Sequence, residues 1–276
     1  MAMTDGYLPA GLDPEVAAQF TAARDAAHRT SYADADALLA VALARAPDQP
    51  LLLAYAALLA RVLYRDPTSA VDRARQLLSG TELEDNLAEA LIAFASRDLA
   101  TSEERARAFL SHVPDDPYAR HLLGATLLAR GSAAEAVTVL ESLIDDHPDF
   151  AAALNHLGGG YLSLGDTERG LAALRRFVEL DPTNASAHDS LADALVQVGD
   201  QEGAIAQLAR ALLLDPSYAY AWVHLGEIFE EMGETNVAAR SYRTARDAPG
   251  VYGVAFADLA NQHLARAALA ADGDST

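Results

Sequence analysis

The sequence predicts an all-α protein built from repeated pairs of helices. The second half of the 276-residue chain aligns with itself at an offset of 34 residues without a gap. Hydrophobic residues make up 51% of the chain but aromatic residues only 7%, so the apolar content is mainly Ala and Leu, which form helices readily. Because Gly and Pro recur at fixed positions, we expect helix hairpins that stack on one another to bury their apolar faces.

Three columns of this alignment mark the ends and the contact points of the helices. A Pro column closes the second helix of each unit, because the residue before Pro avoids the helical conformation. A Gly column supplies the turn that ends the first helix. In a third column, a small residue lets the two helices of a pair approach closely. The columns contain Pro148, Pro182 and Pro216; Gly131, Gly165, Gly199 and Gly233; and Gly124, Gly158, Ala192 and Gly226.

These columns divide the chain into seven units. Four units in the second half follow one another without a gap: 117–150, 151–184, 185–218 and 219–252. Three earlier units are degenerate: 16–49, 50–82 and 83–116. Asp36 stands where the first of these should have a small residue. A single helix over 254–270 is expected to cap the last hairpin, and residues 1–12 and 271–276 are predicted to be disordered tails.

The last full unit carries three aromatic residues, a Leu-Gly pair and an Ala at fixed spacings. These are Trp222, Leu225, Gly226, Phe229, Ala238 and Tyr242. The pattern resembles the tetratricopeptide repeat. The resemblance implies a right-handed α-solenoid of about seven helix hairpins plus a C-terminal capping helix. It also implies that the first helix of each hairpin lines a concave groove, which binds another polypeptide.

The groove columns of the resembled family supply candidate binding residues. In the later units they are Tyr118, His121, Asn155, Gly159, Asp189, Asp193, Tyr220, Glu227 and Glu230. In the earlier units they include Arg24, Leu58, Arg61 and Leu91. The resemblance therefore implies a groove that is apolar early in the chain and acidic late, which suits a protein or peptide with apolar and basic stretches. An alternative is that the degenerate units pack irregularly and bury their candidates against each other.

Three consecutive glycines, Gly158 to Gly160, lie inside a predicted first helix. The repeat accounts for Gly158 alone. Each further Gly costs a helix about 0.8–1 kcal/mol relative to Ala. Either the helix bends here, or the backbone of a ligand comes close to Gly159, or the surrounding packing tolerates the loss.

The formal net charge of −20 narrows the classes of partner. All twenty basic residues are Arg, and the acidic residues are spread along both halves of the chain. A nucleic acid or an anionic membrane is disfavoured, because both attract clustered positive charge. The acidity has three competing explanations: solubility, a salty cytoplasm, or a groove for a basic partner.

Signals for membranes, export and thiol chemistry are missing from the sequence. The longest apolar run, Leu51–Ala60, is shorter than the roughly 20 residues of a membrane span. The first residues lack the charged region of a signal peptide, so we expect a cytoplasmic protein. With no Cys in the chain, disulfides and thiolate chemistry are excluded.

The predicted function is a non-catalytic adaptor or scaffold that presents its groove to a protein segment. The alternative is a structural protein that forms homo-oligomers, in which the terminal helix or residues 1–12 of one molecule dock in the groove of another. We expect no cofactor and no metal site, because His121, His156, His188 and His224 lack the spacing of a metal motif. No catalytic constellation stands out, so an enzyme is not expected.

Overall fold

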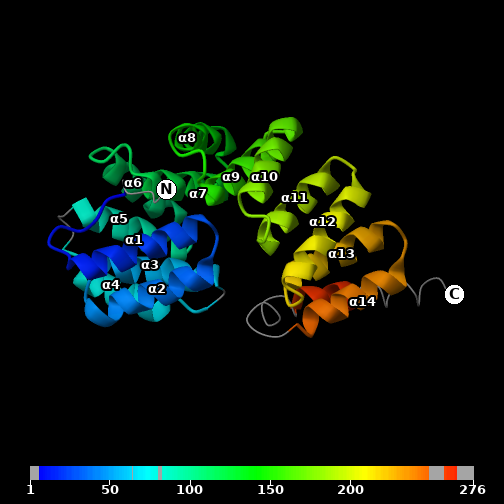
Figure 1. The fold of residues 1–276 in the computed structure, drawn as a ribbon, viewed down its shortest axis with the longest axis horizontal. Coiled ribbons are helices and arrows are strands. Elements are labelled where there is room, and N and C mark those ends of the chain that lie inside the picture. The colour runs from blue at the N-terminus through cyan, green and yellow to red at the C-terminus, as the bar shows by residue number, and fades with distance from the viewer. Residues whose placement is uncertain (1–5, 64, 80–82, 249–257, 266–276) are drawn as a thin grey trace. The chain divides into compact units, whose positions relative to one another are not determined.

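The computed structural model describes residues 6–63, 65–79, 83–248 and 258–265. Every regular element in these ranges is a helix, as the sequence predicts (Figure 1). The chain divides into two compact units, unit 1 at Met1–Asp166 and unit 2 at Thr167–Thr276. None of the described helices combines the length and the apolar content that a bilayer crossing requires.

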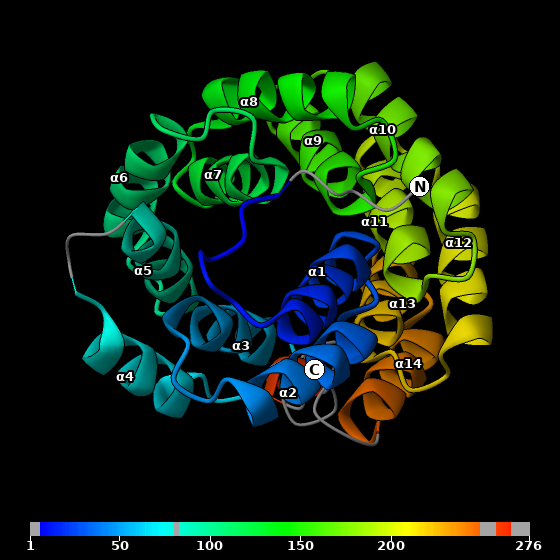
Figure 2. The ribbon, with the colours of Figure 1, turned by 60° about the vertical axis from the view of Figure 1, so that its left-hand side comes forward.

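Unit 1 contains the first nine helices. They are α1 (Pro14–His28), α2 (Tyr32–Arg45), α3 (Pro50–Val62), α4 (Thr68–Leu77), α5 (Leu83–Ala95), α6 (Leu99–Leu110), α7 (Pro117–Ala129), α8 (Ala133–Asp146) and α9 (Ala151–Ser163). The odd-numbered helices face a common interior and the even-numbered helices lie outside them (Figure 2). Helix α1 packs against α9 as well as α2, although α9 is far away in the sequence. The first helices of the hairpins therefore surround the interior of unit 1.

Unit 2 contains α10 to α14 and a further helical segment. The bounds are α10 (Thr167–Leu180), α11 (Ala185–Gln197), α12 (Gln201–Leu214), α13 (Ala219–Glu231) and α14 (Thr235–Arg246). Residues 258–265 are helical, and Ala260 is fully buried in one cluster with Val223, Tyr242 and Ala245. This segment therefore covers the α13–α14 hairpin. The rest of the predicted capping helix and the predicted tail at 271–276 lie outside the described residues, and the right-handed sense and the number of units remain predictions.

The turns between paired helices follow one pattern. In the hairpin of α7 and α8, the Ser132 amide donates to the Leu127 carbonyl at 2.9 Å. In that of α11 and α12, the Asp200 amide donates to the Leu195 carbonyl at the same distance. Between these groups stand Gly131 and Gly199, with φ of 82° and 80°. This is a Schellman turn, and its left-handed residue explains the Gly column.

Two degenerate units have a side chain in this left-handed position. Thr30 and Arg97 have φ of 63° and 67°, where a side chain costs roughly 1–2 kcal/mol. Replacing Thr30 with Gly is expected to raise the free energy of unfolding by about 1 kcal/mol in chemical denaturation, because Gly adopts this conformation without strain. Thr30→Ala is the control, because it keeps the Cβ atom. A Thr30→Gly variant no more stable than the wild type would contradict this prediction.

Small residues hold the paired helices close together. A Cβ atom on Gly226 would lie 2.7 Å from Cδ1 of Tyr242 on the second helix of its hairpin. On the second helices, the column of Ala238 has Ser102 in α6, which is fully buried and lies 3.0 Å from the hydroxyl of Thr126. In α2 the buried position is taken by Ala35, while Asp36 forms an ion pair with Arg65 at 2.8 Å. The expectation that Asp36 takes the place of the small residue was therefore wrong by one residue, because Ala35 holds the place in unit 16–49 that Ala238 holds in unit 219–252.

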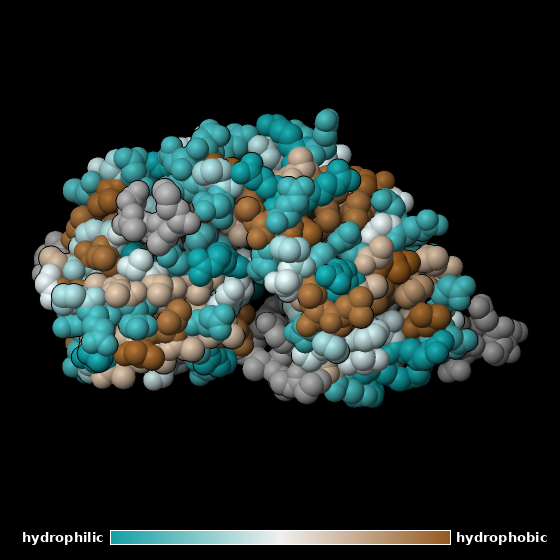
Figure 3. All heavy atoms as spheres, in the orientation of Figure 1, coloured by the Kyte–Doolittle hydropathy of each residue, from teal (hydrophilic) through white to brown (hydrophobic). Residues whose placement is uncertain are grey.

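Hydrophilic side chains are interspersed with apolar ones on the face in Figure 3. Among the exposed large apolar residues, Leu164, Val198 and Met232 recur at the repeat spacing, each as the residue that ends a first helix. They are 48%, 42% and 48% exposed. The repeat thus leaves an apolar side chain open to solvent at several of its turns.

Candidate functional site

The interior of unit 1 contains a pocket of about 180 Å³, here called the unit 1 pocket. Its walls come from the first helices of the hairpins, α1, α3, α5, α7 and α9, together with Tyr32 at the start of α2 and Phe150 just before α9. It is lined by Arg24, Ala27, His28, Tyr32, Tyr55, Leu58, Leu59, Val62, Leu91, Phe94, Tyr118, His121, Leu122, Ala125, Phe150 and His156. The structure therefore brings together five of the predicted groove residues: Arg24, Leu58, Leu91, Tyr118 and His121.

Arg24 is a buried cation at this site. Its side chain is 2% exposed, and its guanidinium lies over the rings of Phe20 at 4.7 Å and Tyr118 at 4.4 Å. Its Nη1 donates to the carbonyl of Tyr7 at 2.7 Å, while its buried Nε has no hydrogen-bond partner. Leu91 is also 2% exposed. Both candidates are therefore buried residues that line the unit 1 pocket.

The segment Gly6–Leu12 lies against unit 1. The amide of Tyr7 donates to Oδ2 of Asp116 at 2.6 Å, and the Tyr7 ring packs edge-on against Phe109 at 5.4 Å. Asp116 is fully buried and its Oδ1 also accepts the amide of Ala119 at 2.7 Å, at the start of α7. The prediction of a disordered tail was wrong for this segment, because the amide and the carbonyl of Tyr7 are paired with Asp116 and Arg24. Residues 1–5 lie outside the described residues.

Three histidines of the unit 1 pocket are held in their neutral form. Burial lowers the pKa of His28 and His156, and it lowers the pKa of His121 well below the ordinary value. Nε2 of His121 and Nδ1 of His156 are 2.9 Å apart, so one imidazole donates to the other. The rings of His28 and His121 both pack against Phe150, at 4.8 and 5.1 Å. Nδ1 of His28 is buried without a hydrogen-bond partner.

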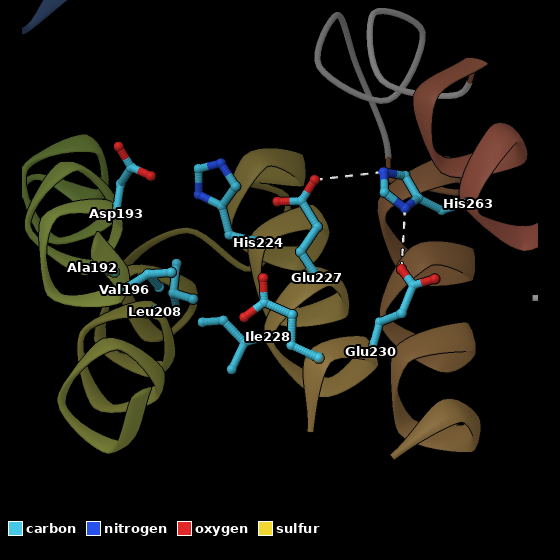
Figure 4. Close-up of a pocket in the computed structure, with 10 residues that line it drawn as sticks. Ala192, Asp193, Val196, Leu208, His224, Glu227, Ile228, Glu230 and His263 are labelled. Carbon is cyan, nitrogen blue, oxygen red and sulfur yellow. Dashed lines mark hydrogen bonds and ion pairs between the residues drawn. The ribbon is translucent and has the colours of Figure 1, made fainter. Parts of the chain in front are cut away.

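Unit 2 contains a second pocket, of about 370 Å³, here called the unit 2 pocket. It is lined by Ala192, Asp193, Val196, Leu208, His224, Glu227, Ile228, Glu230, Glu231 and His263 (Figure 4). Apolar residues of α11, α12 and α13 lie beside the carboxylates of α11 and α13. Asp193, Glu227 and Glu230 were predicted as groove residues, and here they line one pocket.

His263 joins the unit 2 pocket from the 258–265 helix. Its Nε2 lies 3.5 Å from Glu227 and its Nδ1 lies 3.3 Å from Glu230 (Figure 4). The imidazole stacks on the ring of Tyr242 at 4.5 Å, and the hydroxyl of Tyr242 donates to Glu230 at 2.7 Å. The repeat columns did not identify His263, because it lies outside the 34-residue units. The sequence signal that could have indicated His263 was the predicted capping helix over 254–270, which contains this residue.

Asp189 is placed differently from its prediction as a groove residue. Its side chain is 9% exposed and its Oδ1 lies 2.9 Å from Nδ1 of His224. Burial lowers the pKa of His224, but the hydrogen bond and the charge of Asp189 outweigh it, so the net pKa is raised. The carboxylate of Asp189 is therefore engaged by an imidazole inside unit 2.

This pair predicts an elevated titration midpoint for His224. In a histidine NMR titration, we expect His224 to lose its proton at a pH above 6.5, the ordinary midpoint. Asp189→Asn removes the negative charge, so the pKa of His224 is expected to fall below its wild-type value. His188, which contacts Gln207 at 2.7 Å, is the internal control. An unchanged His224 midpoint in the variant would contradict the assignment.

Comparisons with known families agree with the helix pattern. Two tetratricopeptide-repeat family models match residues 87–143, 126–185 and 192–233, which together make up about half of the chain. This chain is a tetratricopeptide-repeat protein. Comparison with curated protein sequences gives no significant match.

The tetratricopeptide-repeat protein is similar in fold to several solved structures. The thermophilic TPR protein TTC0263 from Thermus thermophilus has 22% identity and a TM-score of 0.60, covering 68% of this chain and all of that one. A tetratricopeptide repeat protein from Parabacteroides merdae has 14% identity and a TM-score of 0.63, covering 92% and 99%. The human IFIT1 dimer with m7Gppp-AAAA has 16% identity and a TM-score of 0.72, covering 92% and 62%.

The remaining predicted groove residues of the tetratricopeptide-repeat protein line neither pocket. Arg61 is exposed at the end of α3, and Asn155 is partly buried in α9. The ring of Tyr220 packs near those of Tyr218 at 5.8 Å and His224 at 6.1 Å. Among the described residues, no three His, Asp or Glu side chains are arranged to hold a metal ion.

In the run Gly158–Gly160, close packing explains why Gly is needed at a second position, Gly160. A Cβ atom on Gly160 would lie 2.8 Å from Cγ2 of Val137 on α8, whereas nothing lies within 4 Å of that position on Gly159. Gly159→Ala is therefore expected to stabilise the fold by about 0.8–1 kcal/mol in chemical denaturation, because Ala is the better helix former. Gly160→Ala is the contrasting variant, expected to destabilise. Loss of stability in Gly159→Ala would show that the site is tighter than the structure indicates.

Proposed function

We propose that this tetratricopeptide-repeat protein is a non-catalytic scaffold whose unit 2 pocket receives an amphipathic, basic segment of a partner polypeptide. The observation that carries the proposal is the composition of that pocket. Four carboxylates, those of Asp193, Glu227, Glu230 and Glu231, line the same cavity as Ala192, Val196, Leu208 and Ile228. Such a site suits an Arg or Lys side chain, whose stem is apolar and whose head is charged.

The charge of the pocket supports a cationic partner. No Arg is among the described residues that line the pocket, so no guanidinium shares the cavity with these carboxylates. His263 offsets Glu227 and Glu230 when it is protonated. Glu231 and Asp193 are exposed. Exposed carboxylates of this kind accelerate the association of a basic partner and select against acidic ones.

The same charge argues against RNA as the partner. The human IFIT1 structure contains m7Gppp-AAAA, but the similarity of this chain to it lies in the fold. Phosphate groups in the unit 2 pocket would meet four carboxylates, and the chain carries a net charge of −20. Nucleic-acid binding depends on clustered Lys and Arg that neutralise phosphates. A polypeptide is therefore the proposed partner.

Self-assembly through the N-terminal segment is the less favoured function. Gly6–Leu12 is already engaged with Arg24 and Asp116 of its own chain. We therefore expect the mass in sedimentation-velocity experiments to stay constant over a hundredfold dilution. A mass that falls on dilution would favour the self-assembling alternative.

The binding proposal is tested with a labelled model peptide of alternating Leu and Arg. Fluorescence anisotropy is expected to show binding that weakens at least about tenfold between low and high salt, because the pairs are solvent-accessible. A peptide with citrulline in place of Arg is expected to bind weakly, since it keeps the shape and loses the charge. The double variant Glu227→Gln, Glu230→Gln is expected to bind the Arg peptide about 5- to 30-fold more weakly, at roughly 0.5–1 kcal/mol per pair.

The matched control is Glu179→Gln, an exposed residue of α10 that does not line the pocket. It changes the net charge in the same direction and is expected to bind the Arg peptide almost as the wild type does. Equal affinity for the Arg and citrulline peptides, or equal loss in the control and the double variant, would overturn the proposal.

A further inference from the structure

The helical segment 258–265 engages two of the four carboxylates that line the unit 2 pocket. Nδ1 of His263 lies 3.3 Å from Oε2 of Glu230, and Nε2 lies 3.5 Å from Oε1 of Glu227 (Figure 4). The same Oε2 atom accepts the hydroxyl of Tyr242 at 2.7 Å, and the imidazole stacks on the Tyr242 ring. A cavity of about 370 Å³ remains beside the imidazole. His263 is therefore an internal ligand at the place proposed for the cation of a partner.

Both contacts of His263 are favourable only when its imidazole is protonated. A neutral imidazole has one N–H donor, and its other nitrogen carries a lone pair. Because each nitrogen of His263 faces a carboxylate, the neutral ring directs a lone pair at a negatively charged oxygen in one of the two contacts. The imidazolium donates to both. Imidazoles change charge between about pH 5 and 8, so this contact is sensitive to pH near neutrality.

The groups that face His263 come from two helices. They are Glu227 and Glu230 of α13 and the ring of Tyr242 of α14. Asp258, on the same segment as His263, is exposed. The other ionisable residues of the pocket are Asp193, His224 and Glu231. Among the described residues that line the pocket, the two imidazoles are therefore the only groups able to carry a positive charge.

The segment 258–265 is held in place by few buried side chains. Within it, only Ala260 and His263 are buried, and Leu259 and Leu264 are half-buried. Both distances from His263 to the carboxylates exceed the roughly 2.7–3.2 Å of a typical N–H···O hydrogen bond. Segments with so few buried contacts open at a low cost in free energy. A competing cation can therefore displace this one.

We propose that His263 competes with the partner for the unit 2 pocket. When protonated, the imidazole bridges Glu227 and Glu230 and keeps the segment 258–265 docked. When neutral, it releases both carboxylates to an Arg or Lys side chain of the partner. This regulation rests on the function proposed above, and it makes the binding of a basic segment tighter as the pH rises from about 6 to 8. Arg and ordinary carboxylates keep their charge over that range, so the change comes from imidazoles.

Docking of the segment 258–265 is measured first, without any peptide, by hydrogen exchange corrected for the intrinsic effect of pH. Protection of its amides in the wild type is expected to be about 3- to 10-fold greater at pH 6 than at pH 8, as for a two-state equilibrium shifted by protonation. In His263→Gln, which does not titrate, protection should be low and nearly equal at the two pH values. Asn261→Gln, on an exposed residue of the same segment, is the control and should keep the wild-type pH dependence. Equal protection of the wild type at both pH values would overturn the proposal.

Fluorescence anisotropy with the Leu–Arg peptide, at constant ionic strength, then measures the competition. The wild type is expected to bind about 3- to 10-fold more tightly at pH 8 than at pH 6. His263→Gln should bind more tightly than the wild type at pH 6 and vary less with pH, because His224 is the one imidazole left in the pocket. His263→Arg keeps a positive charge at both pH values and should bind more weakly than the wild type at pH 8. The proposal is wrong if His263→Gln gains no affinity at pH 6, or if His263→Arg equals the wild type at pH 8.

This proposal and the proposed function fail in different ways. If the Arg and citrulline peptides bind equally well at both pH values, the pocket is not the site of a basic segment, and the competition is wrong together with that function. If the Arg peptide binds in a salt-dependent manner but the two His263 variants bind it as the wild type does, the function stands and the competition alone is wrong.

Discussion

Lowering the pH from 7 to 5 is expected to destabilise unit 1, because three histidines there are buried in neutral form and the unfolded chain binds their protons more readily. Burial lowers the pKa of His28, His121 and His156. For His28 burial outweighs the attraction of Asp25. For His121 the neighbouring His156 adds to the effect, since two adjacent imidazoles resist carrying two charges.

The direction follows from the protons bound in each state. Below pH 6.5 the unfolded chain binds a proton on each of these histidines, whereas the folded chain binds it only at a lower pH. Unfolding therefore takes up protons in this window, and the free energy of unfolding falls as the pH falls. Each imidazole contributes at most about 1.4 kcal/mol per pH unit, and the loss stops once the pH is below the folded pKa. Above pH 6.5 this contribution is fully present.

Urea denaturation at several pH values, followed by the fluorescence of tyrosine, measures this dependence. The double variant His121→Gln, His156→Gln keeps hydrogen-bonding groups but does not titrate, so its unfolding free energy should depend less steeply on pH. His112→Gln, on an exposed residue after α6, is the control and should keep the wild-type slope. A wild-type slope in the double variant would show that the acid sensitivity lies elsewhere.

The second large effect is expected at Asp116. Asp116→Ala should lower the free energy of unfolding by about 2–4 kcal/mol, because it removes the cap of α7 and leaves the Tyr7 amide without its acceptor. The carboxylate is fully buried and accepts both amides, at 2.7 and 2.6 Å. Calorimetric or urea unfolding measures the loss. Hydrogen exchange at Tyr7 should also become faster, because the segment Gly6–Leu12 loses its backbone anchor.

The neighbouring carboxylate provides a matched control. Asp115 is 88% exposed and pairs with Arg120 at the surface. Asp115→Ala is expected to change stability by less than about 1 kcal/mol, since exposed ion pairs contribute little. Similar losses of unfolding free energy in the two variants would mean that the stability contributed by Asp116 does not depend on its burial.

Much of the fold was predictable because the repeat encodes local geometry. Helices α7, α9, α11 and α13 begin at Pro117, Ala151, Ala185 and Ala219, the first residues of the four gap-free units. The Gly column predicted the turns that end the first helices, and the structure shows that these glycines are left-handed, a conformation that Gly adopts without strain. The same rule did not identify Thr30 and Arg97, which take the turn conformation despite their side chains. There the hairpin packing imposes the backbone geometry.

The candidate sites were predictable only in part. Asp193, Glu227 and Glu230 share a helix face repeated every 34 residues, so the columns were enough to group them. Asp189 belongs to a different groove column, and inside unit 2 its carboxylate lies 2.9 Å from Nδ1 of His224. Arg24 was expected to face a groove and is instead covered by Phe20 and Tyr118. Aligned positions in the repeat treat all units as equivalent. They do not indicate which neighbouring residue covers a given side chain in the fold.

By itself, the sequence determined the helical class, the period and the positions of the turns, because these depend on residues close together in the chain. Tertiary structure decided that α1 packs against α9 and that Gly6–Leu12 lies against Asp116. It also decided that His263 meets Glu227 and Glu230. These contacts join residues separated by about 30 to more than 100 positions, and they form because burial and hydrogen bonding favour them in three dimensions, independently of any local pattern.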